Sequence, residues 1–355
     1  MASRSRDSFA AARGVIARAI DERAFPAAVA EVGDATRPLW TEAFGRLTFE
    51  PAAPPATADT IFDLASLTKV LATTPLVMQL VERGTLGLDD PVAQHLPAWA
   101  GREREGVTLR DLLAHCSGLP AYRPLYLRER GDAAFQAAIC ALPLEYAPRS
   151  QSTYSDLDMM LLGVIMGGSS GLPSRLAGLL QQMRVADPLQ YNPPPRWRTF
   201  IAPTAQDAYR GRLLVGEPDD ANAWALGGAA GHAGMFGTAP AVGAFARHLL
   251  QVLDGRTGAF QRGTLETFIT RRGDVPGSTR ALGWDTMKDT SSCGSRLSAR
   301  AFGHPGFTGT SLWIDPERGV YAVLLTNRVH PARTNVTIRE VRRAFHDRVM
   351  DALTN

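Results

Sequence analysis

Apolar residues form short strand-like runs near both ends of the chain. Runs rich in β-branched and aromatic residues predict strands at 27–32 and 39–44, joined by a Gly-Asp turn. A second pair is predicted at 311–314 and 320–326, again joined by a turn that contains glycine. Each end of the chain therefore predicts a β-hairpin.

Helical patterns flank these hairpins and fill the middle of the chain. Residues 9–24 and 336–353 have helix-like spacing of apolar positions. Strands at both ends with helices between them predict an α+β fold, in which an antiparallel sheet from both termini is flanked by helices. We expect this sheet domain to span 1–82 and 280–355. Residues 83–279 then form an inserted, mainly helical lobe, with the active site at the interface.

A Ser-x-x-Lys tetrapeptide stands out because the chain almost avoids lysine. Lys69, three residues after Ser66, is one of only two lysines, the other being Lys288. Arginine stays protonated at physiological pH, whereas lysine can change its protonation state when its pKa is lowered. Codon bias or a solvated helix face would explain the pattern without chemistry. A serine beside a lysine also predicts an activated nucleophile.

The residues around this tetrapeptide favour the functional interpretation. Asp63 is a suitable cap for a helix that begins at Leu64, and Ser66 would then lie in its first turn. The apolar run 70–80 predicts that this helix is buried, so its lysine needs a reason to be there. Pro75 predicts a kink, or two short helices joined near residues 73 and 74.

Composition and charge exclude several classes of protein. A net charge of +3 spread over 355 residues disfavours nucleic-acid binding. The apolar stretch 159–166 is too short to span a bilayer, and residues 1–23 lack the apolar segment of a signal peptide. We therefore expect a cytoplasmic protein with no membrane partner, and an exported mature form whose signal has been removed is the alternative. Cys116, Cys140 and Cys293 predict neither a disulfide framework nor a metal site.

Two further segments carry groups that a Ser-Lys nucleophile needs. Tyr154-Ser155-Asp156 lies in a polar segment before an apolar helix, and a tyrosine beside a lysine can have its pKa lowered and serve as a base in a proton shuttle. By itself, Tyr154 is better explained by packing at a helix start. The segment from His304 to Thr310 precedes a predicted strand, and glycines such as Gly306 let a substrate approach its backbone.

Other candidates are weaker. The Gly-x-Ser-x-Gly match at 167–171 follows a helical run rather than a strand, so it predicts a helix end and not a nucleophile elbow. The glycine-rich segment 227–237 lacks phosphate-loop spacing, although His232 within it could reach the pocket. Tyr122 is a candidate for lining the acyl pocket. No cluster has metal-ligand spacing, so we expect neither a metal nor a cofactor.

Together, the three motifs resemble the penicillin-recognising serine hydrolases, most closely the class C β-lactamase and D,D-carboxypeptidase-like family. That family carries Ser-x-x-Lys, Tyr-x-Asn and Lys- or His-x-Gly in this order. Flanking stretches are also similar to family blocks, namely 61–69, 86–92, 109–120 and 225–238. The resemblance extends over about residues 60–330 and implies the β-lactamase/D,D-peptidase-like fold.

The resemblance also implies roles for individual residues. Ser66 would be acylated, with Lys69 activating it and passing protons. Tyr154 would be the general base or acid. The backbone N–H groups of Ser66 and Phe307 would form the oxyanion hole. His304 stands where many relatives have lysine and would contact Tyr154 or a substrate carboxylate, with a charge that depends on pH near neutrality.

Two departures from the family pattern bear on the substrate. Asp156 replaces the usual asparagine, so it cannot donate to a substrate carbonyl and favours a protonated Lys69. Such a Lys69 is a charged positioning group, which shifts the role of base to Tyr154. Pro305 removes a hydroxyl and an N–H near the expected site of a substrate carboxylate. Both changes disfavour a dedicated β-lactamase.

We therefore expect a serine acyl hydrolase that works through a Ser66 acyl-enzyme on a small ester, amide or β-lactam. An esterase or a D-amino-acid amidase or peptidase is the leading interpretation. Acyltransferase or transesterase activity on the same chemistry is an alternative, as is a D,D-carboxypeptidase or β-lactamase. A non-catalytic penicillin-binding-like scaffold is disfavoured by the intact Ser66, Lys69 and Tyr154. The sequence leaves the oligomeric state open.

Overall fold

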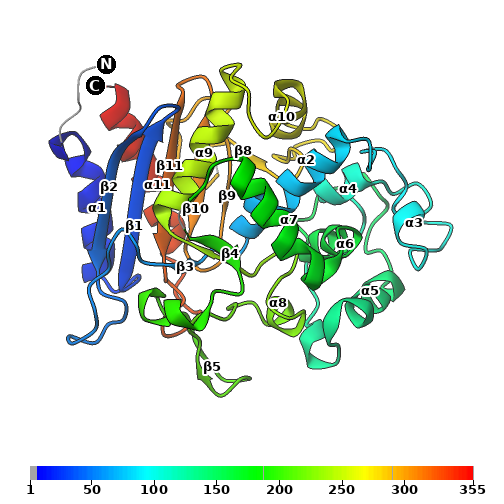
Figure 1. The fold of residues 1–355 in the computed structure, drawn as a ribbon, viewed down its shortest axis with the longest axis horizontal. Coiled ribbons are helices and arrows are strands. Elements are labelled where there is room, and N and C mark those ends of the chain that lie inside the picture. Colours follow the sequence, from blue (N-terminus) through cyan, green and yellow to red (C-terminus); the bar gives the residue numbers. More distant parts are fainter. Residues whose placement is uncertain (1–5, 187, 290, 355) are drawn as a thin grey trace.

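One antiparallel sheet brings the two ends of the chain together, as Figure 1 shows for the computed structural model. The structure describes residues 6–186, 188–289 and 291–354. The sheet has six strands in the order β2-β1-β11-β10-β9-β8. The strands are β1 (Ala27–Asp34), β2 (Pro38–Gly45), β8 (Asp285–Thr286), β9 (Phe302–Pro305), β10 (Ser311–Asp315) and β11 (Val320–Thr326). Both predicted hairpins and the α+β class are confirmed.

Helices cover both faces of this sheet (Figure 1). Helices α1 (Ala10–Asp21) and α11 (Ile338–Thr354) pack together on one face. Helix α9 (Ala239–Leu253) packs on β1 and β11 from the other face. Alternate residues of β1 supply the two cores, since Ala30 and Val32 pack with Phe345 whereas Val29 belongs to the larger core.

The rest of the chain forms a helix-rich lobe beside the sheet (Figure 1). Its helices are α2 (Thr74–Glu82), α3 (Val92–His95), α4 (Leu109–Leu113), α5 (Gly131–Ala141), α6 (Asp156–Ile165), α7 (Gly168–Gln182), α8 (Ala221–Ala225) and α10 (Arg262–Ile269). Short 3₁₀ helices occur at η1 (Arg6–Phe9), η3 (Leu125–Leu127) and η4 (Pro195–Phe200). The Gly-x-Ser-x-Gly match follows a helix and not a strand, because Gly167, with a φ of +100°, comes just after α6 as expected, and residues 168–171 form the first turn of α7. Since α9 packs on the sheet, the exact domain boundaries stay a prediction.

Two small sheets support the region between the lobes. One has three strands in the order β3 (Phe62–Asp63), β7 (Met235–Gly237) and β4 (Leu189–Tyr191). The other is a hairpin of β5 (Gln206–Asp207) and β6 (Arg212–Leu213). All three cysteines are buried and unpaired. No helix in the described part of the chain is long and apolar enough to cross a membrane.

The helix that carries Lys69 begins later than the sequence predicts. Asp63 does not cap a helix at Leu64, because it ends strand β3 and accepts a hydrogen bond from the Ala65 N–H at 2.8 Å. Helical structure begins at Leu67. The predicted cap was therefore wrong, since pairing of β3 with β7 takes the backbone of Asp63.

The helix that carries Lys69 contains a π-helical segment, η2 (Lys69–Thr73), which continues directly into α2. The two helical forms meet at residues 73 and 74, where the sequence predicts a join. Pro75 lies in the first turn of α2, where its missing N–H is tolerated.

Close packing between α9 and β1 depends on a glycine. The Glu31 carboxylate is buried in this interface and accepts hydrogen bonds from the Tyr321 hydroxyl at 2.7 Å and from Arg247 at 3.1 Å. Burial raises the pKa of Glu31, although both partners oppose the rise. A Cβ at Gly243 would lie only 1.8 Å from the Glu31 carboxylate. The helix therefore approaches the sheet at a distance that only glycine allows.

Two glycine-to-alanine changes in helices are expected to have opposite effects on stability. Alanine usually stabilises a helix interior by about 1 kcal/mol relative to glycine. Gly14→Ala in α1 should show this gain, because no atom lies within 4 Å of the added Cβ. Gly243→Ala should instead lower the free energy of unfolding by about 1–3 kcal/mol through overpacking. Urea denaturation of both variants tests this, and equal stabilisation would contradict the close approach of α9.

Candidate active site

Ser66 lies at a sharp turn between strand β3 and the following helix. The preceding residue, Ala65, has a φ of +46°, in the left-handed region that side chains other than glycine rarely occupy. The carboxylate of Asp63 holds this turn by accepting the Ala65 N–H at 2.8 Å and the Asp219 N–H at 2.7 Å. The turn presents Ser66 to a cavity of about 940 Å³.

The buried ammonium group of Lys69 has three acceptors. Its Nζ lies 3.0 Å from Ser66 Oγ, 2.9 Å from the His232 carbonyl oxygen and 2.7 Å from Asp156 Oδ1. An ammonium group has three protons to donate, so each proton has a partner. The Lys69 side chain is 0% exposed, so it is shielded from solvent, and Tyr154 is a further polar neighbour.

The neighbours of Lys69 keep it charged. Burial lowers the pKa of this amine, but the charge of Asp156, together with Tyr154, outweighs burial and raises the pKa above its ordinary value. Lys69 is therefore an ammonium ion at neutral pH, and it donates to Ser66 Oγ rather than accepting from it. Direct removal of the serine proton by a neutral lysine does not describe this resting arrangement.

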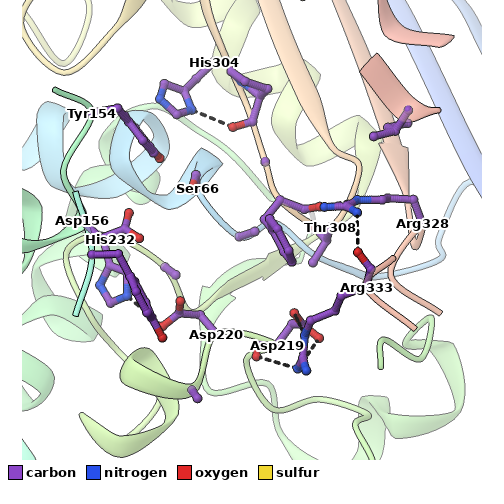
Figure 2. A pocket seen from close by; sticks show the side chains of 18 of the residues that line it. Ser66, Tyr154, Asp156, Asp219, Asp220, His232, His304, Thr308, Arg328 and Arg333 are labelled. Carbon is purple, nitrogen blue, oxygen red and sulfur yellow. Dashed lines mark hydrogen bonds and ion pairs between the residues drawn. The ribbon is translucent and has the colours of Figure 1, made fainter. Parts of the chain in front are cut away.

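Tyr154 is enclosed by four basic side chains. Its hydroxyl points toward Ser66 in Figure 2. Lys69 Nζ and the Arg280 guanidinium each lie 4.9 Å from its ring centroid. The rings of His115 and His304 lie 5.0 and 5.5 Å away. Tyr154 is held in place because Ser155 caps α6 and donates its N–H to His115 Nδ1 at 3.2 Å.

The resting protonation of Tyr154 differs from the sequence prediction. A neighbouring lysine was expected to lower the pKa of this phenol. Burial instead raises its pKa, and the opposing effect of Lys69 is reduced because Asp156 acts in the same direction as burial. Tyr154 is therefore a neutral phenol at rest, which suits a proton donor better than a proton acceptor.

His304 is also neutral, contrary to the expected titration near pH 7. Its ring is 2% exposed, and burial, with the charges of Arg280 and Lys69, holds its pKa well below the ordinary value. The Pro305 carbonyl lies 2.8 Å from Nδ1, so Nδ1 is the protonated nitrogen. Nε2 is then an acceptor, and it is buried without a hydrogen-bond partner. His304 does contact Tyr154, but as a neutral ring.

Two residues that line the cavity, Ser66 and Phe307, have backbone N–H groups available to bind an oxyanion. Neither the Ser66 N–H nor the Phe307 N–H has an acceptor in the described part of the structure. The segments that carry them are joined, since the Thr308 hydroxyl donates to the Asp63 carbonyl at 2.7 Å and the Thr310 hydroxyl donates to the Leu64 carbonyl at 3.1 Å. The nucleophile turn and the loop after β9 therefore form one unit.

Gly306 is required where this loop meets the nucleophile segment. An added Cβ there would lie 2.0 Å from the Thr310 hydroxyl oxygen and 2.7 Å from the Leu64 carbonyl oxygen. Tyr122 and His232 also line the cavity. Tyr122 is 41% exposed, whereas His232 is 1% exposed and pairs with Asp220 Oδ1 at 2.9 Å. Every residue that the sequence singled out for the site therefore lies in or beside this cavity, except Lys69, which is buried behind Ser66.

Sequence reasoning missed several lining residues. Asp220 is one of them, and although burial opposes ionisation, His232 lowers the pKa of Asp220 to about 2. Arg280 and Tyr209 are others, both on loops without a recognisable motif. Among the described residues, no group of three His, Cys, Asp or Glu side chains could hold a metal ion.

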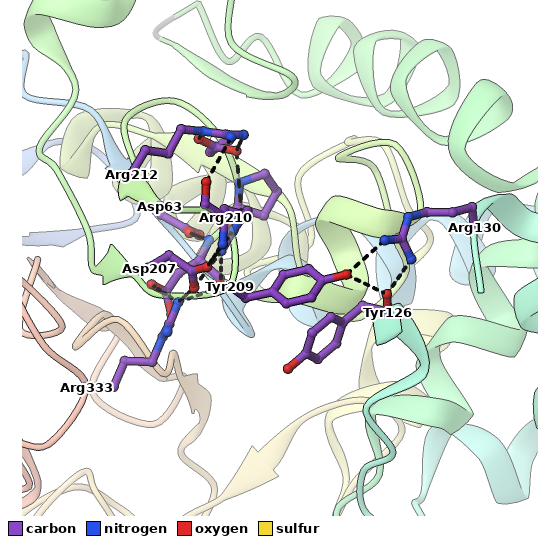
Figure 3. Close-up of polar contacts among 11 residues, drawn as sticks. Asp63, Tyr126, Arg130, Asp207, Tyr209, Arg210, Arg212 and Arg333 are labelled. Atoms are coloured by element: carbon purple, nitrogen blue, oxygen red, sulfur yellow. Dashed lines mark hydrogen bonds and ion pairs between the residues drawn. The ribbon is translucent and has the colours of Figure 1, made fainter. Parts of the chain in front are cut away.

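Tyr209 is fixed at the mouth of the cavity by the β5–β6 hairpin (Figure 3). Its ring meets Tyr126 edge to face at 4.9 Å, and its hydroxyl accepts from Arg130 at 3.0 Å. Asp207 anchors the hairpin by pairing with Arg333 at 2.8 Å and with Arg210. Burial opposes ionisation, but the two guanidinium groups lower the pKa of Asp207 to about 2.

Comparison with known proteins gives one family over most of the chain. The family model described as Beta-lactamase matches residues 12–346. A protein of Escherichia coli (strain K12) named "Putative D-alanyl-D-alanine carboxypeptidase" is 31% identical over 312 residues, which cover 78% of this chain and 70% of that protein.

Solved structures share the fold. One titled "EstCE1, a hydrolase with promiscuous acyltransferase activity" has a TM-score of 0.77 and 22% identity, with 97% of this chain and 99% of that chain covered. A penicillin-binding protein homologue from Caulobacter crescentus has a TM-score of 0.74 and 20% identity, with 98% of each chain covered. At these identities the likeness concerns the fold alone.

The two lysines of the chain allow a direct test of the Lys69 environment. In protein labelled with ¹³C-lysine, we expect the Lys69 side-chain signal to stay that of an ammonium ion up to pH 10, because Asp156 raises the pKa of Lys69. Asp156→Asn removes the charge that outweighs burial, so Lys69 should lose its proton at a pH lower by about 1–3 units. Lys288→Arg assigns the signals. Titration of Lys69 at the same pH in both proteins would contradict the role of Asp156.

Proposed function

The chain belongs to the Beta-lactamase family of serine hydrolases, and from that premise we propose that it cleaves esters through an acyl-enzyme on Ser66. The observation that carries this proposal is the Lys69 ammonium group, which lies 3.0 Å from Ser66 Oγ and 2.7 Å from Asp156 at the end of the cavity. A buried cation beside a serine stabilises the developing alkoxide.

We propose that the serine proton reaches Asp156 through Lys69. As Ser66 Oγ bonds to the substrate carbonyl carbon, its proton moves to Lys69, and Lys69 gives one of its own protons to Asp156. Both transfers follow the two short contacts of Nζ. Lys69 keeps its single positive charge, and the negative charge passes from Asp156 to the carbonyl oxygen, which the N–H groups of Ser66 and Phe307 face.

Tyr154 then acts on the leaving group. As a neutral phenol beside Ser66, it donates its proton to the leaving oxygen when the carbonyl–oxygen bond breaks, and it regains a proton from Lys69, which recovers the one held by Asp156. In deacylation the same proton transfers run in reverse, with water in place of the leaving alcohol. The site returns to its resting protonation after each turnover.

Esters suit this site better than amides or β-lactams. Asp156 places a carboxylate where an amide substrate would need a hydrogen-bond donor for its carbonyl group, and Pro305 has no N–H to offer a substrate carboxylate. An ester is compatible with both positions, because it needs no second hydrogen-bond donor at position 156 and has no carboxylate that must be bound at position 305. D-Amino-acid amides remain the second substrate class, because the nucleophile and proton relay serve both.

The mouth of the cavity favours an apolar substrate group. Six large hydrophobic side chains in the described chain are exposed, and four of them, Tyr122, Tyr209, Phe307 and Val336, line this cavity. Exposed apolar side chains gathered at one cavity indicate a surface that is covered when ligand binds. We therefore propose an ester with an aromatic or branched apolar part.

Acyl transfer is a second candidate. The cavity of about 940 Å³ has room for an acceptor alcohol beside an acylated Ser66, and the aromatic mouth would favour an apolar alcohol over water. The acyl group would then move from Ser66 Oγ to the alcohol oxygen, with the alcohol proton leaving by the same route as a water proton. Adding butanol to the ester assay and separating the products distinguishes transfer from hydrolysis.

Labelling of Ser66 tests the proposed function. The protein is incubated with p-nitrophenyl butyrate, a fluorophosphonate or a fluorescent penicillin, and its intact mass is measured. We expect ester turnover and a fluorophosphonate adduct, both lost in Ser66→Ala because the nucleophile is gone. Ser169→Ala, in the Gly-x-Ser-x-Gly segment, is the matched control and should keep both. Turnover that survives in Ser66→Ala would exclude the proposed nucleophile.

Removal of one aromatic side chain tests the substrate class. Tyr209→Ala should raise KM for p-nitrophenyl phenylacetate by about 10-fold, as expected for loss of roughly 1–2 kcal/mol of apolar contact, and leave p-nitrophenyl acetate nearly unchanged. Phe200→Ala is the control, because Phe200 is 54% exposed but lies outside the cavity. Equal effects of the two variants on both esters would refute binding at the mouth.

A further inference from the structure

We propose that Arg342 and Arg328 are positioning residues that fix and polarise the peptide group between Gly306 and Phe307, whose N–H faces the oxyanion. This inference rests on the proposed acylation of Ser66. It concerns how the second oxyanion donor is held, and its basis is the set of contacts that two buried guanidinium groups, both at the wall of the cavity, make with the carbonyl groups of the β9–β10 loop.

Arg342, in the first turns of α11, reaches the carbonyl groups of this loop and also lines the cavity. One of its terminal nitrogens donates to the Gly306 carbonyl oxygen and, at 2.7 Å, to the Thr310 carbonyl oxygen. The residue is 6% exposed, and no carboxylate in the described part of the chain pairs with it. Its charge is therefore directed at backbone carbonyl groups rather than neutralised.

The contact with Gly306 acts on the oxyanion donor through one peptide bond. The carbonyl of Gly306 and the N–H of Phe307 belong to the same planar trans unit, so they point in opposite directions. A guanidinium on the carbonyl side fixes the plane and turns the N–H toward Ser66. It also draws electron density to the carbonyl oxygen, which strengthens the N–H as a donor, as in other chains of hydrogen bonds.

Arg328 holds the next peptide of the same loop. Its Nε donates to the Phe307 carbonyl oxygen at 2.7 Å, and its guanidinium lies 4.3 Å from the centroid of the Phe307 ring. Its Nη1 donates to the Asn335 carbonyl at 2.7 Å, so the group is anchored from behind. Figure 2 shows Arg328 beyond Thr308, on the side away from Tyr154. The peptide group before Phe307 and the peptide group after it are therefore each held by a guanidinium group.

The two buried arginines lower the stability of the fold, so a structural role alone does not explain them. Burial, together with repulsion from Arg328 and Arg339, lowers the pKa of Arg342 to about 9. Buried like charges without a counterion destabilise a fold. The carbonyls also have other donors, since the Gly309 N–H donates to Gly306 at 3.1 Å and the Gly306 N–H donates to Thr310 at 2.6 Å. Backbone hydrogen bonding therefore does not require Arg342.

The experiment compares an ester with its thionoester in Arg342→Met. Sulfur accepts hydrogen bonds poorly, so a C=S substrate gains little from an oxyanion hole, whereas a C=O substrate gains fully. Arg342→Met should lower kcat/KM for p-nitrophenyl butyrate by about 10-fold, less than the 10²–10³-fold cost of deleting a donor. The thionoester rate should fall by less than 3-fold. Arg343 instead donates to the Ser291 carbonyl, so Arg343→Met is the matched control and should change neither the ester rate nor the thionoester rate.

Stability and a conservative variant separate positioning from folding. The melting temperature of Arg342→Met should stay the same or rise, because a buried unpaired charge is removed. Arg342→Lys keeps the charge and should recover part of the ester-to-thionoester ratio. An unchanged ratio in Arg342→Met, with Ser66 still labelled by fluorophosphonate, would overturn the inference and leave the proposed function intact. Failure of the wild-type protein to label Ser66 would overturn the proposed function itself.

Discussion

The site is organised around one buried positive charge. The ammonium group of Lys69 is removed from solvent, and it is tolerated because three acceptors from different parts of the chain meet at Nζ. Ser66 comes from the turn after β3, Asp156 from the start of α6, and the His232 carbonyl from the glycine-rich segment before β7. A shift of any one of these would leave a proton of a buried cation without a partner. The requirement to satisfy this charge therefore fixes how the sheet and the helical lobe meet.

A second connection joins the nucleophile to the sheet. Thr308 and Thr310 donate to the carbonyl groups of Asp63 and Leu64, so the loop after β9 moves with the turn that presents Ser66. The lysine therefore connects Ser66 to the helical lobe, and the threonines connect it to the sheet. Ser66 and the oxyanion donors belong to this one unit, whereas Tyr154 and Asp156 come from the start of α6 in the helical lobe, so relative movement of the lobes would change the distance between Ser66 and these two side chains. The packing of the two lobes thus contributes directly to the geometry of the site.

Much of this arrangement could be predicted from sequence because it is local. Strand periodicity predicted both hairpins, and the three-residue spacing of Ser66 and Lys69 predicted that the two side chains meet, although Ser66 lies in the turn just before the helix. The start of that helix was missed, since β3 pairing is a long-range contact that no local cap reveals. The protonation of Tyr154 and His304 was also missed. Burial is the largest cause of both pKa shifts, with Lys69 and Asp156 acting on Tyr154 and Arg280 and Lys69 acting on His304, and such burial arises only when distant segments pack. Arg342 and Arg328 carry no motif, and their roles depend on which carbonyl groups they reach.

The scarcity of lysine has a consequence for handling this protein. Lys69 is fully buried and occupied by three acceptors, whereas Lys288 is exposed and does not line the cavity. Amine-reactive dyes, cross-linkers and activated resins should therefore modify a single side chain, with the α-amino group as the other reactive amine. Molecules coupled through Lys288 would share one orientation, with the cavity unmodified. The composition that first drew attention to Ser66 and Lys69 also makes the protein suitable for oriented immobilisation.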